Sequence, residues 1–408
     1  MTKKILCFIL VLFYGKAKAQ KDSLEIKIGQ MILIGMPKAE VDSAVLEEVR
    51  RGRVGSIIYF EKNIPKSPSA FAAFKKMSWT YQRAAPIPLF ICIDQEGGKV
   101  NRLKEKYGFT KSITAESIGK SKSIDSVRFY SEATAATLAG LGINVNFAPC
   151  VDLAVNPANP IIAKYGRAYS SNEDSVTFFA KEVVKQHRRF GIVTALKHFP
   201  GHGSSQDDTH LGLADVSNTW TSRELKPYQA MIDSGYVDGV MSSHIVNRNL
   251  DANALPGTLS KSVLDVMLRI KMHYNGVVFS DDMQMRAIVN NYGFEESIKM
   301  AINAGVDIVC FANNVPAAEL RTVGEIHAII KKFIVSGEIP KSRIDESFRR
   351  IMKLKKSIQR TELERMKVEN QKLVQLSNQT AAELKSANEE IQKLTPKKKS
   401  RKNKKSKS

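Results

Sequence analysis

Short apolar segments alternate with amphipathic segments between residues 28 and 314, and this alternation restricts the fold more than any other feature of the sequence. The apolar segments are six to eight residues long and mostly rich in Ile, Val and Phe, as is typical of strands buried on both faces. They span residues 31–36, 54–60, 88–94, 143–150, 193–199, 239–245, 276–281 and 306–312. The segments between them, such as 126–141 and 174–190, have the apolar spacing of helices.

Eight strands that alternate with helices predict an α/β protein with a (β/α)8 barrel of the TIM type. An open, doubly wound sheet is the alternative. No Gly-x-Gly-x-x-Gly motif follows the first strand, and the sequence contains no phosphate-binding loop. Cys92, Cys150 and Cys310 fall in the apolar segments, so we expect buried free thiols rather than disulfides.

Polar residues follow most of the predicted strands. In a barrel of this kind, functional side chains collect at the carboxyl ends of the strands. Six of the eight predicted strands end in ionisable or amide residues, which we expect to face one common site. These residues are Asp94 and Glu96, Asp152, Lys197 and His198, Ser243 and His244, Asp281 and Asp282, and Asn313 and Asn314.

The segment 197–210 is the densest group of proton-carrying residues, with three of the seven His of the chain. One Pro and two Gly interrupt it, which indicates a loop at a site of chemistry rather than a core element. If the loop folds back on itself, Asp208 can orient the imidazole of His210 and raise its basicity. A zinc site in this segment is a weaker alternative, because the spacing matches no common zinc motif.

Four segments together resemble the family 3 glycoside hydrolases, specifically their single-domain β-N-acetylglucosaminidase (β-hexosaminidase) branch. They are Ile93-Asp94-Gln95-Glu96-Gly97-Gly98, Asn144-Val145-Asn146-Phe147-Ala148-Pro149, the segment 197–210, and Phe279-Ser280-Asp281-Asp282-Met283-Gln284-Met285. The resemblance covers residues 26–355, and its most specific part is Lys-His-Phe-Pro-Gly-His-Gly followed by Asp-x-His. Lys99 departs from the Arg that the family usually has after the Gly pair, and Ile113-Thr114 replace a usual Pro-Ser.

The resemblance implies a retaining mechanism, with Asp281 as the nucleophile and His210 as the general acid/base supported by Asp208. Such a mechanism needs one group to attack the anomeric carbon and another to protonate the departing oxygen. A His suits the second task because it titrates near neutral pH. Since side chains alternate along a strand, only one of Asp281 and Asp282 should face the barrel mouth, and the family pattern favours Asp281.

The resemblance also implies a set of residues that contact the terminal sugar. Charged donors and acceptors would fix the ring and reject sugars whose hydroxyls point the wrong way. The residues that correspond to sugar-binding positions are Asp94, Arg167, Lys197 and His198, and His244 and Met283 are expected to line the pocket.

The sequence changes in character near both ends. Residues 1–19 have the pattern of a cleavable signal peptide, so we expect export to the periplasm or the cell exterior. Residues 20–355 make up the predicted barrel. Helix formers dominate residues 356–395, which predicts a helical or coiled-coil extension. The Lys-rich residues 396–408 are expected to be disordered.

Eight charges of the net +21 belong to this last segment, which has eight Lys or Arg and no acid between residues 397 and 407. Such a tail can bind an anionic polymer or a membrane surface by releasing counterions. It has no aromatic residues for base stacking, so specific nucleic-acid recognition is not expected.

The resemblance, together with the signal-peptide pattern, therefore implies an exported, exo-acting, retaining β-N-acetylglucosaminidase. It would hydrolyse terminal non-reducing GlcNAc from peptidoglycan fragments, including muropeptides, or from other glycans, through a covalent glycosyl–Asp281 intermediate and without a cofactor or metal. The alternatives within the family are a β-glucosidase, a β-xylosidase or a GlcNAc phosphorylase. Outside it, the alternative is a non-catalytic protein that binds cell wall or anionic surfaces through its tail.

Overall fold

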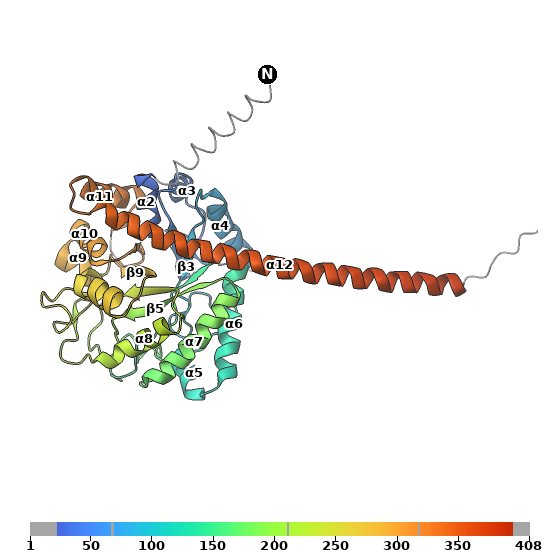
Figure 1. The fold of residues 1–408 in the computed structure, drawn as a ribbon, viewed down its shortest axis with the longest axis horizontal. Helices are drawn as coiled ribbons and strands as arrows, with labels where there is room; N and C mark the ends of the chain where they lie inside the picture. Colours follow the sequence, from blue (N-terminus) through green and yellow to red (C-terminus); the bar gives the residue numbers. More distant parts are fainter. Residues whose placement is uncertain (1–22, 67–68, 210–211, 317–318, 395–408) are drawn as a thin grey trace, which may run out of the picture. The chain divides into compact units, whose positions relative to one another are not determined.

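The computed structural model describes residues 23–66, 69–209, 212–316 and 319–394 (Figure 1). Eight of the described strands form a closed parallel barrel in the order β1-β10-β9-β7-β5-β4-β3-β2. They are β1 (Ile32–Gly35), β2 (Ser56–Tyr59), β3 (Phe90–Ile93), β4 (Val145–Asn146), β5 (Val193–Phe199), β7 (Gly239–Ser242), β9 (Val277–Asp282) and β10 (Ile308–Phe311). The predicted (β/α)8 barrel is confirmed, and the open sheet is excluded.

Helices surround the barrel and connect its strands (Figure 1). The α-helices are α2 (Leu24–Gln30), α3 (Ser43–Arg50), α4 (Ala70–Ala84), α5 (Ala115–Ser121), α6 (Ile124–Gly140), α7 (Glu173–Arg189), α8 (Lys226–Asp233), α9 (Arg286–Tyr292), α10 (Phe294–Ala304), α11 (Val323–Val335) and α12 (Lys341–Leu394). A π-helix, η5 (Ser262–Lys271), precedes β9, and short 3-10 turns include η1 (Glu61–Asn63) and η3 (Ser222–Leu225). A small parallel pair, β6 (Ala214–Asp215) and β8 (Ile245–Val246), lies outside the barrel sheet.

Helix α7 shows why the amphipathic segments form helices. It begins after Asn172, whose side chain accepts a hydrogen bond from the Ser175 amide at 2.9 Å and so caps the first turn. Acidic residues occupy its first turn and basic residues occupy its last turn. These charges interact favourably with the helix dipole and stabilise the helix. Its buried residues, including Val176, Phe179 and Val183, recur at helical spacing and pack into the core.

Aromatic side chains fill the inside of the barrel. The ring of Phe279 on β9 lies 6.3 Å from Phe90 on β3 and 5.2 Å from Phe147, which follows β4. Strands β3 and β9 stand four places apart in the eight-strand order, so their side chains can meet only through the interior. The barrel is therefore packed rather than hollow, and space for a ligand remains at its ends. Cys92, Cys150 and Cys310 are buried and form no disulfide, as expected.

The start of α12 covers the amino ends of several strands. Lys355 is buried there and donates to Gln30 Oε1 at 2.6 Å and to the Gly55 carbonyl at 2.9 Å, just before β1 and β2. Burial lowers the pKa of Lys355 to about 7. Arg343 of the same helix pairs with Asp307, just before β10, at 2.7 Å. These contacts hold the end of the barrel that faces away from the expected site.

The chain divides into two compact units, Met1–Gln359 and Arg360–Ser408. In the second unit, α12 is helical as far as Leu394, and a coiled coil there stays a prediction. The predicted signal peptide, 1–19, and the Lys-rich tail, 396–408, lie outside the described residues. No helix in the described ranges combines the length and the apolar character that a bilayer-crossing segment requires.

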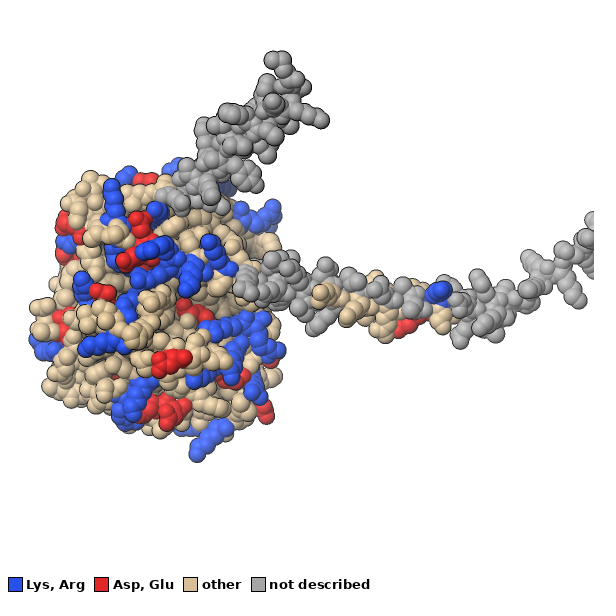
Figure 2. All heavy atoms as spheres, in the orientation of Figure 1, with Lys and Arg blue, Asp and Glu red and all other residues tan. Residues whose placement is uncertain are grey.

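Charged side chains are dispersed over the face of the first unit drawn in Figure 2, where Lys and Arg alternate with Asp and Glu. Ion pairs link many of the charged side chains of the described residues, for example Lys299 with Glu338 at 2.8 Å. Exposed pairs of this kind contribute little stability individually.

Candidate active site

A cavity of about 520 Å³ opens at the carboxyl ends of the barrel strands. Its volume lies within the range of small-ligand sites, roughly 300–1,000 Å³. Residues at or just beyond the ends of β2, β3, β5, β7, β9 and β10 contribute to its wall. The sequence-predicted site residues among those that line it are Asp94, Arg167, Lys197, His198 and Asp281.

Lys197 is the centre of the charge network in this cavity. It lies on β5 and is 2% exposed, and its Nζ sits 2.7 Å from Asp94 Oδ1 and 2.6 Å from Glu96 Oε1. Burial opposes the charge on Lys197, but the two carboxylates prevail and hold the pKa of Lys197 above its ordinary value. The ammonium group is therefore fixed and charged before any ligand arrives.

Glu96 joins this network to Arg167. Arg167 Nε and Nη2 donate to the two carboxylate oxygens of Glu96 at 2.8 and 2.7 Å, the bidentate geometry that suits a guanidinium. Burial alone would raise the pKa of Glu96, but Arg167 and Lys197 hold it well below its usual range. Asp94 also lies 3.6 Å from Arg102, which lines the cavity and was not singled out from the sequence.

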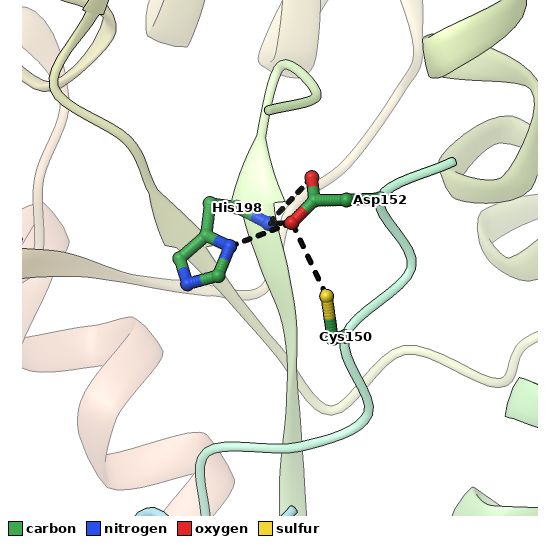
Figure 3. A group of neighbouring side chains, drawn as sticks. All are labelled: Cys150, Asp152 and His198. Carbon is green, nitrogen blue, oxygen red and sulfur yellow. Dashed lines mark hydrogen bonds and ion pairs between the residues drawn. The ribbon is translucent and has the colours of Figure 1, made fainter. Parts of the chain in front are cut away.

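His198 is oriented by Asp152 (Figure 3). Its Nδ1 lies 2.7 Å from Asp152 Oδ2, and its Nε2 lies 3.1 Å from Nη2 of Arg167. A guanidinium can only donate, so Nε2 accepts and the proton of a neutral His198 sits on Nδ1. Asp152 also accepts from the backbone amide of His202 at 2.8 Å, which ties the loop after β5 to the segment after β4.

Cys150, Asp152 and His198 are close enough to be considered as metal ligands (Figure 3). The distances in this group, however, are those of hydrogen bonds: the Cys150 thiol donates to Asp152 at 3.2 Å. Burial raises the pKa of the Cys150 thiol well above its ordinary value, whereas a metal ligand is a thiolate. The Arg167 guanidinium beside His198 also disfavours a second cation. The trio is best explained as a hydrogen-bonded support for His198.

Asp281 and Asp282 end β9, and both line the cavity. Asp282 stabilises the backbone after β9 and β10. Its Oδ1 accepts hydrogen bonds from the amides of Gln284 at 3.1 Å and Ala312 at 3.0 Å. Asp281 Oδ1 accepts from the amide of Asp282 at 2.8 Å. The expectation that only one of the two would reach the cavity was too strict, because β9 ends here and the regular alternation of a strand ends with it.

Two residues that we expected to line the pocket, His244 and Met283, are not among those that line the cavity. Met283 is fully buried in the core, since the chain turns after β9 and directs this side chain inward. His244 is also fully buried, and its Nε2 donates to the carbonyl of Asp282 at 3.0 Å. His244 therefore supports the backbone behind Asp281. Met241 and Met285 line the cavity instead.

The loop after β5 is held by Glu224, a buried residue of η3 that the sequence did not single out. Its carboxylate accepts from the amides of Gly203 at 2.7 Å and Ser204 at 3.1 Å. Gly201 has φ +116°, and a Cβ there would lie 2.4 Å from Cβ of Glu224, so this position requires Gly. No sequence motif marks Glu224, because its partners are backbone amides about twenty residues earlier.

The end of this loop carries the predicted acid/base group. His202 is buried, and burial lowers its pKa to about 4, so the imidazole is neutral at pH 7. His202 and Thr209 line the cavity, and Asp208 immediately precedes Thr209. His210 lies outside the described residues, so its role and its contact with Asp208 stay predictions.

Replacing Lys197 should damage both stability and turnover. In Lys197→Met, Asp94 and Glu96 lose a shared buried cation, and breaking such a pair costs about 3–5 kcal/mol in the free energy of unfolding. Urea unfolding measures this loss. Lys99→Met, which removes an exposed lysine of the same cavity, is the matched control and should unfold within about 0.5 kcal/mol of wild type. Equal stabilities of the two variants would contradict the network as described.

Glu224 should make the stability of the protein depend on pH. Burial raises its pKa from the ordinary 4.5 to about 7, so the folded state favours the protonated form. This contribution to the free energy of unfolding is complete below pH 4.5 and is lost as the pH rises through 7, with an upper bound of about 3 kcal/mol. Glu224→Gln cannot ionise, so its urea-unfolding free energy should fall less than that of wild type between pH 5 and pH 8. Identical pH slopes would refute this assignment.

Comparison with known proteins is consistent with this geometry. Residues 23–354 match the family model described as the glycosyl hydrolase family 3 N terminal domain. The chain is 33% identical over 286 residues to a β-hexosaminidase of Xylella fastidiosa (strain M23), a match that covers 68% of this chain and 82% of the relative. It is 29% identical over 326 residues to β-hexosaminidase A of Pseudoalteromonas piscicida, covering 76% of this chain and 54% of that protein.

Solved structures show the same likeness. A family 3 β-N-acetylglucosaminidase from Paenibacillus sp. str. FPU-7 superposes with a TM-score of 0.76 at 32% identity, covering 82% of this chain and 62% of the other. A β-N-acetylhexosaminidase from Beutenbergia cavernae superposes with a TM-score of 0.72 at 26% identity, covering 82% and 98%. The chain thus spans about half the length of the Pseudoalteromonas relative and nearly all of the Beutenbergia enzyme.

Proposed function

The chain belongs to glycosyl hydrolase family 3, and from this membership we propose that it is an exo-acting β-N-acetylglucosaminidase that releases terminal GlcNAc from glycans. The observation that carries the proposal is the buried network of Asp94, Lys197, Glu96 and Arg167, which faces Asp281 across one cavity. Such fixed charges bind sugar hydroxyls in one orientation and need no rearrangement during the reaction.

We propose that the reaction proceeds in two displacements. Asp281 attacks C1 of the bound GlcNAc while the bond from C1 to the leaving oxygen breaks, and His210 donates its proton to that oxygen. A water molecule then attacks C1, His210 takes a proton from it, and the C1–Asp281 bond breaks to return the free carboxylate. The sugar keeps its anomeric configuration. Asp208 would fix the tautomer of His210 and stabilise its cation.

A panel of aryl β-glycosides tests the proposed activity. We expect kcat/KM for the GlcNAc glycoside to exceed that for the glucoside and the xyloside by about 100-fold or more, since a site built to pair with a polar group rejects a sugar that lacks it. A preference for glucose or xylose would instead favour the other activities of the family. No cleavage of any glycoside would favour the non-catalytic binding protein.

A hydrolase and a phosphorylase differ in the molecule that attacks C1 in the second displacement, which is water in a hydrolase and phosphate in a phosphorylase. A neutral imidazole would not repel phosphate as a carboxylate would, so phosphorolysis is the second candidate. Product analysis with and without phosphate distinguishes them: we expect free GlcNAc under both conditions. GlcNAc 1-phosphate in the presence of phosphate would establish the phosphorylase.

We also propose that the enzyme is exported and that its basic tail, 396–408, attaches it to an anionic polymer or membrane surface. The support is the sequence pattern at the two ends. Deleting residues 396–408 should leave kcat/KM on aryl GlcNAc unchanged and weaken binding to acidic polymers, most strongly at low salt. A parallel loss of turnover would show that the tail serves catalysis instead.

A further inference from the structure

Two buried polar side chains, Asn146 and His187, lie behind the charge network of the active site. Asn146 is the last residue of β4 and is completely buried, and His187 lies on α7 and is 2% exposed. Both line a small cavity of about 30 Å³ together with Glu96 and Arg167. Neither is among the described residues that line the catalytic cavity. Buried polar groups cost free energy unless they are hydrogen-bonded, so their partners indicate what the two side chains do.

The side chain of Asn146 holds both backbone polar groups of Gln95. Its Oδ1 accepts from the Gln95 amide at 3.0 Å, and its Nδ2 donates to the Gln95 carbonyl at 3.1 Å. The paired residues of β3 and β4 are Cys92 with Val145 and Ile93 with Asn146. The amide of Asn146 therefore replaces a backbone partner for Gln95 just beyond the end of this ladder.

Gln95 stands between the two carboxylates that bind Lys197. Side chains alternate along an extended chain, so Asp94 and Glu96 share one side, and both reach Lys197 Nζ, at 2.7 and 2.6 Å. The Gln95 side chain binds elsewhere, with its Oε1 accepting from the amide of Arg102 at 3.0 Å. A rotation of the Gln95 peptide groups would therefore redirect both carboxylates and shift the segment that carries Arg102.

His187 fixes the orientation of the Asn146 amide. Its Nδ1 lies 2.9 Å from the carbonyl oxygen of Val183, and its Nε2 lies 3.0 Å from Nδ2 of Asn146. A carbonyl oxygen only accepts, so Nδ1 carries the proton and Nε2 accepts from Asn146. Burial lowers the pKa of His187 to about 4, so the ring is neutral at pH 7 and keeps this acceptor. A flipped Asn146 amide would place its oxygen against Nε2, acceptor against acceptor.

We propose that Asn146 and His187 form a positioning pair that sets the sugar selectivity of the active site. His187 acts through Asn146, and Asn146 acts through the backbone of Gln95 on Asp94 and Glu96. This inference rests on the proposed β-N-acetylglucosaminidase function and concerns its choice of sugar. Charges held in one geometry separate GlcNAc from GalNAc, which differs in the direction of one hydroxyl.

The ratio of kcat/KM for an aryl β-GlcNAc to kcat/KM for the corresponding aryl β-GalNAc tests the proposal. This ratio does not depend on the fraction of folded enzyme, so a variant that is only less stable leaves it unchanged. His187→Asn has a shorter amide that does not reach Asn146, and we expect the ratio to fall about tenfold. His187→Gln places an amide oxygen near the position of Nε2 and should retain most of the wild-type ratio.

Val184→Ala is the matched control, because it removes buried packing from α7 and leaves the bond between His187 and Asn146 in place. Its ratio should equal that of wild type. Asn146→Asp gives a second route if His187→Asn does not fold: a carboxylate cannot donate to the Gln95 carbonyl, so the ratio should again fall.

Three results would overturn the proposal. They are an unchanged ratio in either folded variant, His187→Asn or Asn146→Asp, an equal loss in His187→Gln and His187→Asn, and a loss of the same size in Val184→Ala. Failure of wild type to cleave aryl GlcNAc at all would instead overturn the function on which the proposal rests.

Discussion

Asp281→Ala should lower kcat/KM by about 10⁴-fold or more on every GlcNAc substrate, whatever its leaving group. The loss is independent of the leaving group because no other described side chain is placed to replace the nucleophile at the end of β9: Asp282 is held by the amides of Gln284 and Ala312. Steady-state kinetics on aryl GlcNAc and on a disaccharide measure the loss.

Asp282→Asn is the matched control for this variant. Its remaining side-chain oxygen can still accept from the Gln284 and Ala312 amides, so we expect a loss within about tenfold, as for a supporting hydrogen bond. Azide gives a second check, since it can enter the space left by the Asp281 carboxylate and attack C1 from the same side. It should restore turnover of activated aryl GlcNAc by Asp281→Ala and give a glycosyl azide of inverted configuration. A greater loss of kcat/KM in Asp282→Asn than in Asp281→Ala would mean that the two roles are exchanged.

His210→Ala should show a different pattern, with a loss that depends on the leaving group. Protonation matters most when the departing oxygen is a poor leaving group, so we expect a loss of about 10³-fold on a disaccharide and about tenfold on an activated aryl glycoside. Asp208→Asn should show the same trend with smaller losses, because it alters the orientation of His210 rather than removing it. A Brønsted series of aryl GlcNAc substrates measures the dependence, and equal losses across it would rule out His210 as the acid.

The fold could be predicted from the sequence because each barrel strand is buried on both faces. Such strands appear as continuous apolar segments, and β9, for example, lies almost entirely within the predicted segment 276–281. Functional side chains were expected at the carboxyl ends of the strands, and this expectation selects Asp94, Lys197, His198 and Asp281. The fold brings these four residues to one cavity. Arg167, in the loop between β4 and α7, required the family resemblance, since nothing in its local sequence places it beside Glu96.

The remaining site features depend on contacts that a sequence does not encode locally. Glu224 acts on the backbone amides of Gly203 and Ser204, and any residue type presents the same amide. Met283, which the family resemblance placed at the pocket, is buried in the core because the chain turns after β9.

Labelling of the nucleophile tests the central claim most directly. A slow, fluorine-substituted GlcNAc donor with a good leaving group should accumulate the covalent intermediate, which mass spectrometry can locate in the tryptic peptide 272–286. We predict one sugar per chain, attached to Asp281, with labelling prevented by free GlcNAc. Attachment to Asp282, or full turnover of the reagent with no labelled residue in this peptide, would contradict the account.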